Sequence, residues 1–229
     1  MVWGIDEEHV FPPVEDANED GLLCVGGDLH PDRLILAYCS GIFPWNDKPC
    51  MWFSPDLRST LNINEYRPSK SLKRLLKSNK FTVKFDSNFR QVIDLCAETH
   101  GETWISEEFI DSYCELHDRG IAHSVEVYHE DDLVGGLYGL SLGTAFMGES
   151  MFHTVSNASK VAFSALVYQL RFWGFTLLDC QVENEHLTSL GAEDIHRDDY
   201  MQQLDKALLN NTKVGHWIYE KESLFCEAK

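Results

Sequence analysis

The chain of 229 residues is poor in basic side chains, with 19 Lys and Arg against 37 Asp and Glu and a formal net charge of −18. This balance excludes a protein that binds nucleic-acid phosphates over its whole surface. The sequence also lacks an apolar run near the roughly 20 residues that a membrane-spanning helix needs, so we expect no membrane partner. Because the first residues, MVWGIDEEHV, are acidic, we expect no secretory signal peptide and a cytoplasmic protein.

Sequence motifs for metals and for nucleotide phosphates are missing as well. The seven cysteines are odd in number without a C-x-x-C pair, and the ten histidines show neither H-x-x-x-H nor H-E-x-x-H spacing. We therefore expect reduced cysteines and no metal site. Neither G-x-x-x-x-G-K-[ST] nor G-x-G-x-x-G occurs, so the two common phosphate-binding loops are absent.

The composition favours a globular protein, because 44% of the residues are hydrophobic and 12% aromatic. Residues 1–60 are rich in Pro, Gly and aromatics, with sustained periodicity only over Asp32–Cys39, whereas helix and strand patterns alternate after them. We therefore divide the chain into an N-terminal domain, residues 1–60, and a second domain, residues 61–229.

The second domain has an α+β pattern. An antiparallel meander of three strands is predicted at Ala122–His129, Leu133–Leu142 and Thr144–Phe152. A helix that is apolar almost all round follows at Ser156–Trp173, and then a strand at Phe175–Val182. Further helices are predicted at Ser69–Ser78, Ser87–Thr99, Ser106–Arg119, Glu185–Gly191 and Arg197–Asn210, with a strand at Phe81–Asp86. This is also the core order of the acyl-CoA N-acyltransferase fold, although unrelated sheets share it.

One helix carries an uninterrupted basic stripe. Residues 66–84 hold no acid and a net charge of +7, so the rest of the chain carries −25. Leu72, Leu75 and Leu76 share one face of the predicted helix, and the opposite face consists of Lys70, Lys73, Arg74 and Lys77. These four residues, the basic stripe, form either a solvated surface or a site for a phosphate backbone.

Two neighbouring segments, Gly41–Trp45 and Trp52–Pro55, concentrate aromatic residues and prolines. They either pack against the second domain or leave one indole exposed as a platform on which a base can stack.

Carboxylates occur inside two apolar strands. Regular alternation places Glu149 on one face with Met147 and Met151, where it needs either an internal partner or a substrate ammonium. Asp179 and Gln181 share a face of the later strand. A carboxylate and an amide at this spacing can orient an amine and accept its proton, unless the strand simply ends in solvent there.

Motifs throughout the chain resemble those of the leucyl/phenylalanyl-tRNA–protein transferases. The resemblance covers most of the chain, apart from about the first ten residues and the tail after Tyr219. It is carried by Gly21–Leu23, Gly26–Leu29, Gly41–Trp45, Trp52–Asp56, Thr103–Ile105, His123–Val127, Leu133–Gly136, Gly148–Phe152, Asn157–Lys160, Leu178–Val182 and Ser189–Ala192.

The resemblance implies a bacterial cytoplasmic enzyme without a metal or small cofactor. It would move Leu or Phe, and Met less readily, from aminoacyl-tRNA to proteins that begin with Arg or Lys, and the product carries a degradation signal. It also implies a small N-terminal domain followed by an acyl-CoA N-acyltransferase-like domain with a mostly antiparallel central sheet and flanking helices. We expect a monomer.

The resemblance also implies roles for individual residues. Trp45 matches the residue that stacks on the terminal adenine, and Trp104 lines the same site. Glu149 matches a residue near the aminoacyl α-amine, and Asp179 with Gln181 matches the catalytic pair. The basic stripe falls in the tRNA-contacting cluster, and the hydrophobic pocket would contain Leu137, Met151, Phe163 and Leu166.

Two other functions are compatible with parts of the sequence. One is a small-molecule N-acetyltransferase that uses acetyl-CoA, although the turn His153–Asn157 lacks the glycine-rich loop that would hold a pyrophosphate. The other is a non-catalytic adaptor for tRNA or degradation signals, in which Asp179 would affect only affinity.

Overall fold

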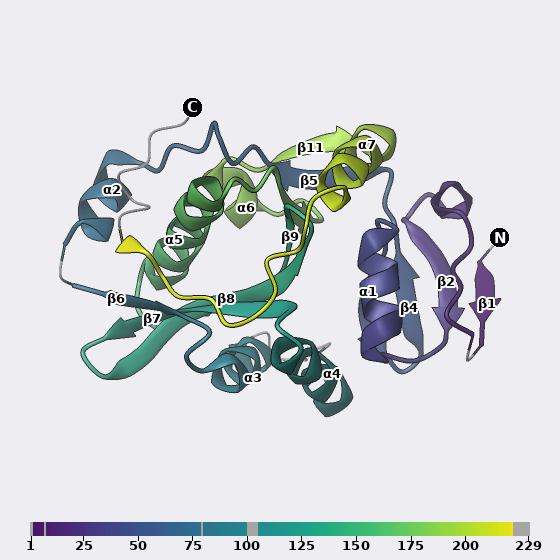
Figure 1. Ribbon diagram of the computed structural model, residues 1–229, viewed down its shortest axis with the longest axis horizontal. Coiled ribbons are helices and arrows are strands. Elements are labelled where there is room, and N and C mark those ends of the chain that lie inside the picture. Colours follow the sequence, from purple (N-terminus) through teal and green to yellow (C-terminus); the bar gives the residue numbers. More distant parts are fainter. Residues whose placement is uncertain (1, 7, 79, 100–104, 222–229) are drawn as a thin grey trace.

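The chain folds into two sheets and the helices around them (Figure 1). A computed structural model describes residues 2–6, 8–78, 80–99 and 105–221. The first sheet has the strand order β1-β2-β4-β3, with β1 (Trp3–Ile5), β2 (Leu22–Gly26), β3 (Phe43–Asp47) and β4 (Cys50–Phe53). A short 3-10 helix, Val14–Asp16, precedes β2, and α1 (Pro31–Cys39) contacts both β3 and α4 (Glu107–Asp118). Through α1, the first sheet therefore packs against the rest of the molecule.

The second sheet has seven strands in the order β11-β5-β10-β9-β8-β7-β6. Its strands are β5 (Leu57–Leu61), β6 (Thr82–Phe85), β7 (Ala122–His129), β8 (Asp132–Leu142), β9 (Ala145–His153), β10 (Leu177–Gln181) and β11 (Glu193–His196). All neighbours are antiparallel except β9 and β10, which are parallel. The expected mostly antiparallel sheet is confirmed.

Helices cover both faces of this sheet (Figure 1). The helix α5 (Ala158–Trp173) packs on β7, β8 and β9, with α2 (Lys70–Leu76) beside it, and α3 (Phe89–Thr99) and α4 lie on the other face. The two remaining helices are α6 (Glu185–Leu190) and α7 (Arg197–Leu208). The apolar sequence of α5 predicted its burial correctly, since all its residues from 158 to 170 except Lys160 are buried. No helix among the described residues has the length and apolar character needed to cross a membrane.

The predicted meander, β7 to β9, and the strand β10 are confirmed, but two strands of the same sheet were not predicted. The strand β5 reads Leu-Arg-Ser-Thr-Leu and buries its polar side chains, so it shows no apolar alternation. The strand β11 is short and largely exposed. The strand β4 belongs to the first sheet and β5 to the second, so the chain passes from one sheet to the other between them. We therefore retain the division into two domains near residue 60 as a proposal.

A β-bulge lies in β9 at Glu149. Gly139 of β8 pairs with Gly148, and Tyr138 pairs with Ser150, so Glu149 is an extra residue without a partner in β8. A side chain at position 139 would place its Cβ 2.1 Å from the carbonyl oxygen of Met147, so only glycine fits there. Beyond this bulge, the side chains of β9 therefore point to the opposite face of the sheet from the one that regular alternation predicts.

The prediction that Met147, Glu149 and Met151 share one face is therefore wrong. Met147 packs in the core on the α3 side of the sheet, and Met151 packs in the core on the α5 side. The extra residue between them places the two methionines on opposite faces.

Candidate active site

A cavity of about 630 Å³ opens where β9 and β10 separate. The parallel pairing of the two strands ends at Met147 and Asp179. Residues 148–153 of one strand, and 179–184 in and after the other, line the cavity. The gap between diverging strands thus provides a concave site whose walls are two neighbouring strands.

The predicted site residues gather in this cavity, apart from the basic stripe. Its lining includes Trp45, Leu137, Glu149, Met151, Phe163, Leu166, Asp179 and Gln181. Trp104 lies outside the described residues. Positions far apart in the sequence, on β3, β8, β9, α5 and β10, are therefore brought to one place by the fold.

One part of the cavity is apolar. Leu137, Phe163 and Leu166 are buried residues that line it, and Met151 is half-buried beside them. Phe146, Leu178 and Leu187 complete this wall. Such a surface stabilises a hydrophobic side chain by removing it from water, and the flexible thioether of Met151 can adapt to its shape.

The indole of Trp45 lies at another edge of the cavity and is 43% exposed. Its ring centroid lies 5.6 Å from that of Phe53 and 6.2 Å from that of Phe43, so the indole packs against both rings. Trp52, in contrast, is fully buried and donates to the carbonyl of Gly26. Of these two indoles, Trp45 is the one available for stacking.

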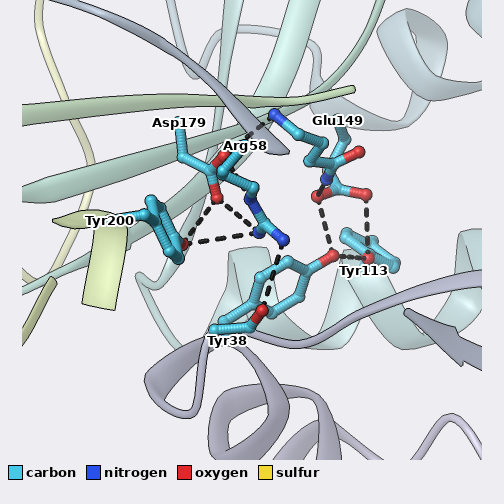
Figure 2. A network of polar contacts seen from close by, with 8 residues as sticks. Tyr38, Arg58, Tyr113, Glu149, Asp179 and Tyr200 are labelled. Carbon is cyan, nitrogen blue, oxygen red and sulfur yellow. Dashed lines mark hydrogen bonds and ion pairs between the residues drawn. The ribbon is translucent and has the colours of Figure 1, made fainter. Parts of the chain in front are cut away.

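The most buried charge in the cavity belongs to Asp179, whose side chain is 0% exposed. Arg58 on β5 donates to it through Nε to Oδ1 at 2.9 Å and through Nη2 to Oδ2 at 2.7 Å. Tyr200 on α7 donates to Oδ2 at 2.8 Å (Figure 2). The backbone N–H of Gln181 donates to Oδ1, also at 2.8 Å. A carboxylate offers about four lone-pair positions, and all of those of Asp179 are occupied.

Arg58 is held as firmly as its partner. Its guanidinium lies between the rings of Phe43 and Tyr200, 4.5 and 4.6 Å from their centroids, and donates to the carbonyl of Gly41. Burial by itself lowers the pKa of Arg58, but the charge and hydrogen bonds of Asp179, together with the nearby hydroxyl groups of Tyr200 and Tyr38, outweigh it and the pKa is raised. Arg58 is therefore cationic, and Asp179 is the anion that compensates it.

The second carboxyl group, Glu149, lies among hydroxyl groups (Figure 2). Tyr38 on α1 donates to Oε1 at 2.7 Å, and Tyr113 on α4 donates to Oε2 at 3.1 Å. Gln181 donates from Nε2 to Oε1 at 2.6 Å. The partner that the sequence required for Glu149 is thus internal.

This cluster has room for one more proton. The two hydroxyl groups of Tyr38 and Tyr113 lie 2.5 Å apart, and each also contacts Glu149. The three groups thus form three oxygen–oxygen contacts, but the two hydroxyl groups supply only two protons. When Glu149 is protonated it supplies a third proton, so that each contact can be a hydrogen bond. Burial raises the pKa of Glu149 to about 7, against the opposing effect of the hydrogen bonds from Tyr38 and Tyr113. Glu149 can therefore gain or lose a proton near neutral pH.

Gln181 connects the two carboxyl groups. Its φ of +62° is unusual for a residue with a side chain, and it lies at an irregularity in the pairing of β10 with β5. The bond from its N–H to Asp179 and the bond from its side chain to Glu149 hold this conformation. Strained backbone of this kind is typical of functional sites.

Four residues of the cluster were not predicted: Tyr38, Arg58, Tyr113 and Tyr200. Arg58 lies two residues after the motif Trp52–Asp56, and the polar run Arg-Ser-Thr gives no sign of burial. The three tyrosines are indistinguishable in the sequence from ordinary core aromatics.

The basic stripe lies outside the main cavity, on α2. Leu72 is buried, Leu75 and Leu76 are half-buried against α5 and its surroundings, and the four basic residues are exposed, as predicted. Ser69 caps the helix by accepting from the N–H of Leu72 at 3.2 Å.

Two family models match the chain. The model of the leucyl/phenylalanyl-tRNA protein transferase family matches residues 60–205, and that of the family's N-terminal domain matches residues 27–56. The chain belongs to this family. Members of the leucyl/phenylalanyl-tRNA–protein transferase family are aminoacyltransferases, and the resemblance of the sequence motifs is thereby confirmed.

Individual relatives align over nearly their whole length. A leucyl/phenylalanyl-tRNA–protein transferase from Flavobacterium johnsoniae is 52% identical over 85% of this chain and 94% of its own. One from Nitrosospira multiformis is 46% identical over 98% of this chain and 100% of its own. Among solved structures, an aminoglycoside acetyltransferase from an uncultured soil metagenomic sample matches with a TM-score of 0.38 and 16% identity, over 62% of this chain and 97% of that one.

Proposed function

We propose that this chain transfers Leu or Phe, and Met less readily, from aminoacyl-tRNA to the N-terminal α-amine of proteins that begin with Arg or Lys. The product would carry an N-terminal degradation signal. The observation that carries the proposal is the union of an apolar pocket and a cluster of two carboxyl groups in one cavity. We further propose a cytoplasmic monomer that works without a cofactor.

The donor would occupy the cavity along its length. The aminoacyl side chain enters the apolar part, lined by Leu137, Met151, Phe163 and Leu166. The terminal adenine stacks on Trp45, and stacking of one base contributes about 1–3 kcal/mol. Trp104 retains its proposed place beside this base. The α-amine of the aminoacyl group lies near Glu149, whose carboxyl group offsets its desolvation.

The reaction is the aminolysis of an ester. The α-amine of the acceptor attacks the carbonyl carbon of the donor, the bond from that carbon to the ribose 3′-oxygen breaks, and a peptide bond forms. The nitrogen loses one proton and the 3′-oxygen gains one. A model α-amine has a pKa near 7.7–8.0, so part of it is neutral at neutral pH, and the enzyme contributes chiefly by alignment and proton transfer.

We assign different parts to the two carboxyl groups. Asp179 was expected to hold the attacking amine or accept its proton, but its four acceptor positions are already taken. We therefore propose that Asp179 positions Gln181, which orients the amine. Glu149, with its pKa near 7, would receive the proton and pass it to the leaving oxygen.

The test is to incubate the purified chain with leucyl-tRNA labelled in the amino acid and with matched peptides that begin with Arg or with Ala. Label should move to the Arg peptide and far less to the Ala peptide. A parallel reaction with labelled acetyl-CoA and small amines tests the N-acetyltransferase alternative. No transfer from leucyl-tRNA to either peptide, or acetyl transfer alone, contradicts the proposal.

A further inference from the structure

A second cavity, of about 410 Å³, lies between α2, α5 and α6. Residues of the three helices line the cavity, together with the segment before α2 and the residue before α5. The lining consists of Tyr66, Arg67, Pro68, Ser69, Ser71, Leu72, Leu75, Asn157, Lys160, Ser189 and Leu190. None of the site residues described above belongs to it.

Its lining is cationic and free of acids. Arg67 and Lys160 bring two positive charges, while Ser71, Ser189 and Asn157 bring polar groups. Among the described residues no Asp or Glu lines the cavity, although acids outnumber bases 37 to 19 in the chain. A concave site with cations, hydroxyl groups and no carboxylate is suited to an anion.

Lys160 is unusual among the residues of α5. It is half-buried in a helix whose neighbouring residues are buried, and its ammonium makes no ion pair with any residue in the described part of the chain. The charge of Lys160 also acts on His186, a residue that lines the main cavity. Burial lowers the pKa of His186, and the positive charge of Lys160 lowers it further. Arg67 donates to the carbonyls of Asn64 and Tyr66 through Nη1 alone. Its Nη2 can serve a ligand.

The second cavity adjoins the main one along two helices. Ser159 and Phe163 of α5 line the main cavity, while Lys160 of the same helix lines the second. On α6, His186 and Leu187 line the main cavity, and the last residues of the helix, Ser189 and Leu190, line the second. The remaining wall consists of α2, the helix that carries the basic stripe, and of the segment before it.

We propose that this second cavity is a phosphate subsite in which Lys160 and Arg67 bind one backbone phosphate of the tRNA 3′ strand. A strand that runs from the basic stripe on α2 to the main cavity passes this position. The single phosphodiester charge would compensate a lysine that lacks an acidic partner. The assignment of the strand rests on the proposed function.

The test compares Lys160→Gln with Lys206→Gln, which removes the same charge from an exposed position on α7. We expect Lys160→Gln to raise KM for aminoacyl-tRNA on the order of tenfold, as loss of a hydrogen bond to a charged group does. The slope of log KM against log salt should fall by about 0.7, the share of one phosphate on a single strand. KM for an aminoacyl-adenosine donor, which has no phosphate, should stay unchanged, as should both values in Lys206→Gln.

Further variants separate the subsite from folding. Lys160→Arg should recover most of the affinity for tRNA, and Arg67→Gln should repeat the loss seen in Lys160→Gln. Equal losses with both donors would show that Lys160 supports the main cavity and would overturn the subsite.

Binding of uncharged tRNA in the same variants keeps this test independent of transfer. If wild-type protein transfers nothing but Lys160→Gln still weakens tRNA binding tenfold, the proposed function fails and the subsite stands. A titration with inorganic phosphate distinguishes the source of the ligand. If Lys160→Gln abolishes binding of inorganic phosphate but leaves tRNA binding intact, the cavity serves a free phosphate and the assignment to the strand is overturned.

Discussion

Arg58 binds both carboxylate oxygens of Asp179, at 2.9 and 2.7 Å, in a place where neither side chain is more than 1% exposed. The pair joins two adjacent strands, β5 and β10, at the wall of the main cavity. Through the rings of Phe43 and Tyr200 on either side of Arg58, it also links the first sheet to α7. The position of Gln181 therefore depends on contacts from three separate parts of the chain.

Breaking this pair should affect stability and activity differently. Arg58→Met leaves Asp179 buried without a cation, and a buried charge that loses its partner costs about 3–5 kcal/mol of unfolding free energy. The double variant Arg58→Met/Asp179→Asn removes both charges, so it should recover much of that stability, as measured by urea denaturation. Its kcat should remain low, because Gln181 is no longer positioned by a carboxylate.

Asp179→Asn alone tests whether Asp179 positions Gln181 or accepts the proton of the attacking amine. If Asp179 positions Gln181, kcat/KM for the acceptor should fall and an added base such as imidazole should not restore it. Recovery of the rate with rising imidazole concentration would identify Asp179 as the proton acceptor instead. Wild-type transfer rates in this variant would remove Asp179 from the mechanism.

Glu149 should make both activity and stability depend on pH near 7. Its pKa is raised from 4.5 to about 7, so the folded protein retains a proton that the unfolded chain loses between these values. The contribution of this group to stability therefore falls as pH rises from 4.5 to 7, by about 3 kcal/mol in total.

In Glu149→Gln the free energy of unfolding should depend less on pH between pH 5 and pH 7 than it does in the wild type. The rise of kcat/KM with pH through about 7 should also disappear, since ionised Glu149 is the active form. Aminoacyl donors should lose more affinity than analogues without the α-amine. Unchanged pH profiles of both quantities would contradict the role of Glu149.

Tyr113 affects the pKa of Glu149. Its hydrogen bond to Glu149 lowers the pKa of that carboxyl group against the larger effect of burial. Tyr113→Phe should thus move the midpoint of the kcat/KM profile to higher pH. Tyr138→Phe is the matched control, because the buried hydroxyl group of Tyr138 has no hydrogen-bond partner in the described part of the chain. A shift of equal size in both variants would point to a general change in packing.

Trp45→Ala should weaken both aminoacyl-tRNA and aminoacyl-adenosine by about 1–3 kcal/mol, because the stacked base is present in each donor. KM for the two donors gives the measurement. Trp3, exposed to 48% on β1, provides a control substitution on the same sheet. Full affinity in Trp45→Ala, with the fold retained, would exclude a stacking role.

The basic stripe should matter for full-length tRNA alone. Changing Lys73, Arg74 and Lys77 to Ala should raise KM for aminoacyl-tRNA and lower its salt slope by up to about 2, as expected for three contacts to a single strand. The aminoacyl-adenosine donor should be nearly unaffected. Equal losses with both donors would mean that α2 has a structural role.

Local patterns in the sequence predicted much of this molecule. The alternation of β7, the acidic turn after it and the apolar sequence of α5 are enough to predict a hairpin and a buried helix, since these patterns are read over neighbouring residues. The amphipathic pattern of α2 likewise determined which side chains of that helix face water. The motifs around Trp45, Glu149 and Asp179 identified residues that line one cavity.

Tertiary structure decided how those residues are connected. The bulge that frees Glu149 from the alternation of β9 depends on the close approach of Gly139 and Met147 across the strand pair. Arg58 lies 121 residues before Asp179 in the chain, and Tyr38 lies 111 before Glu149. A buried ion pair and a buried cluster of hydroxyl and carboxyl groups form only when folding brings distant polar groups together away from water, where each must satisfy the other, and local sequence patterns do not record such pairing.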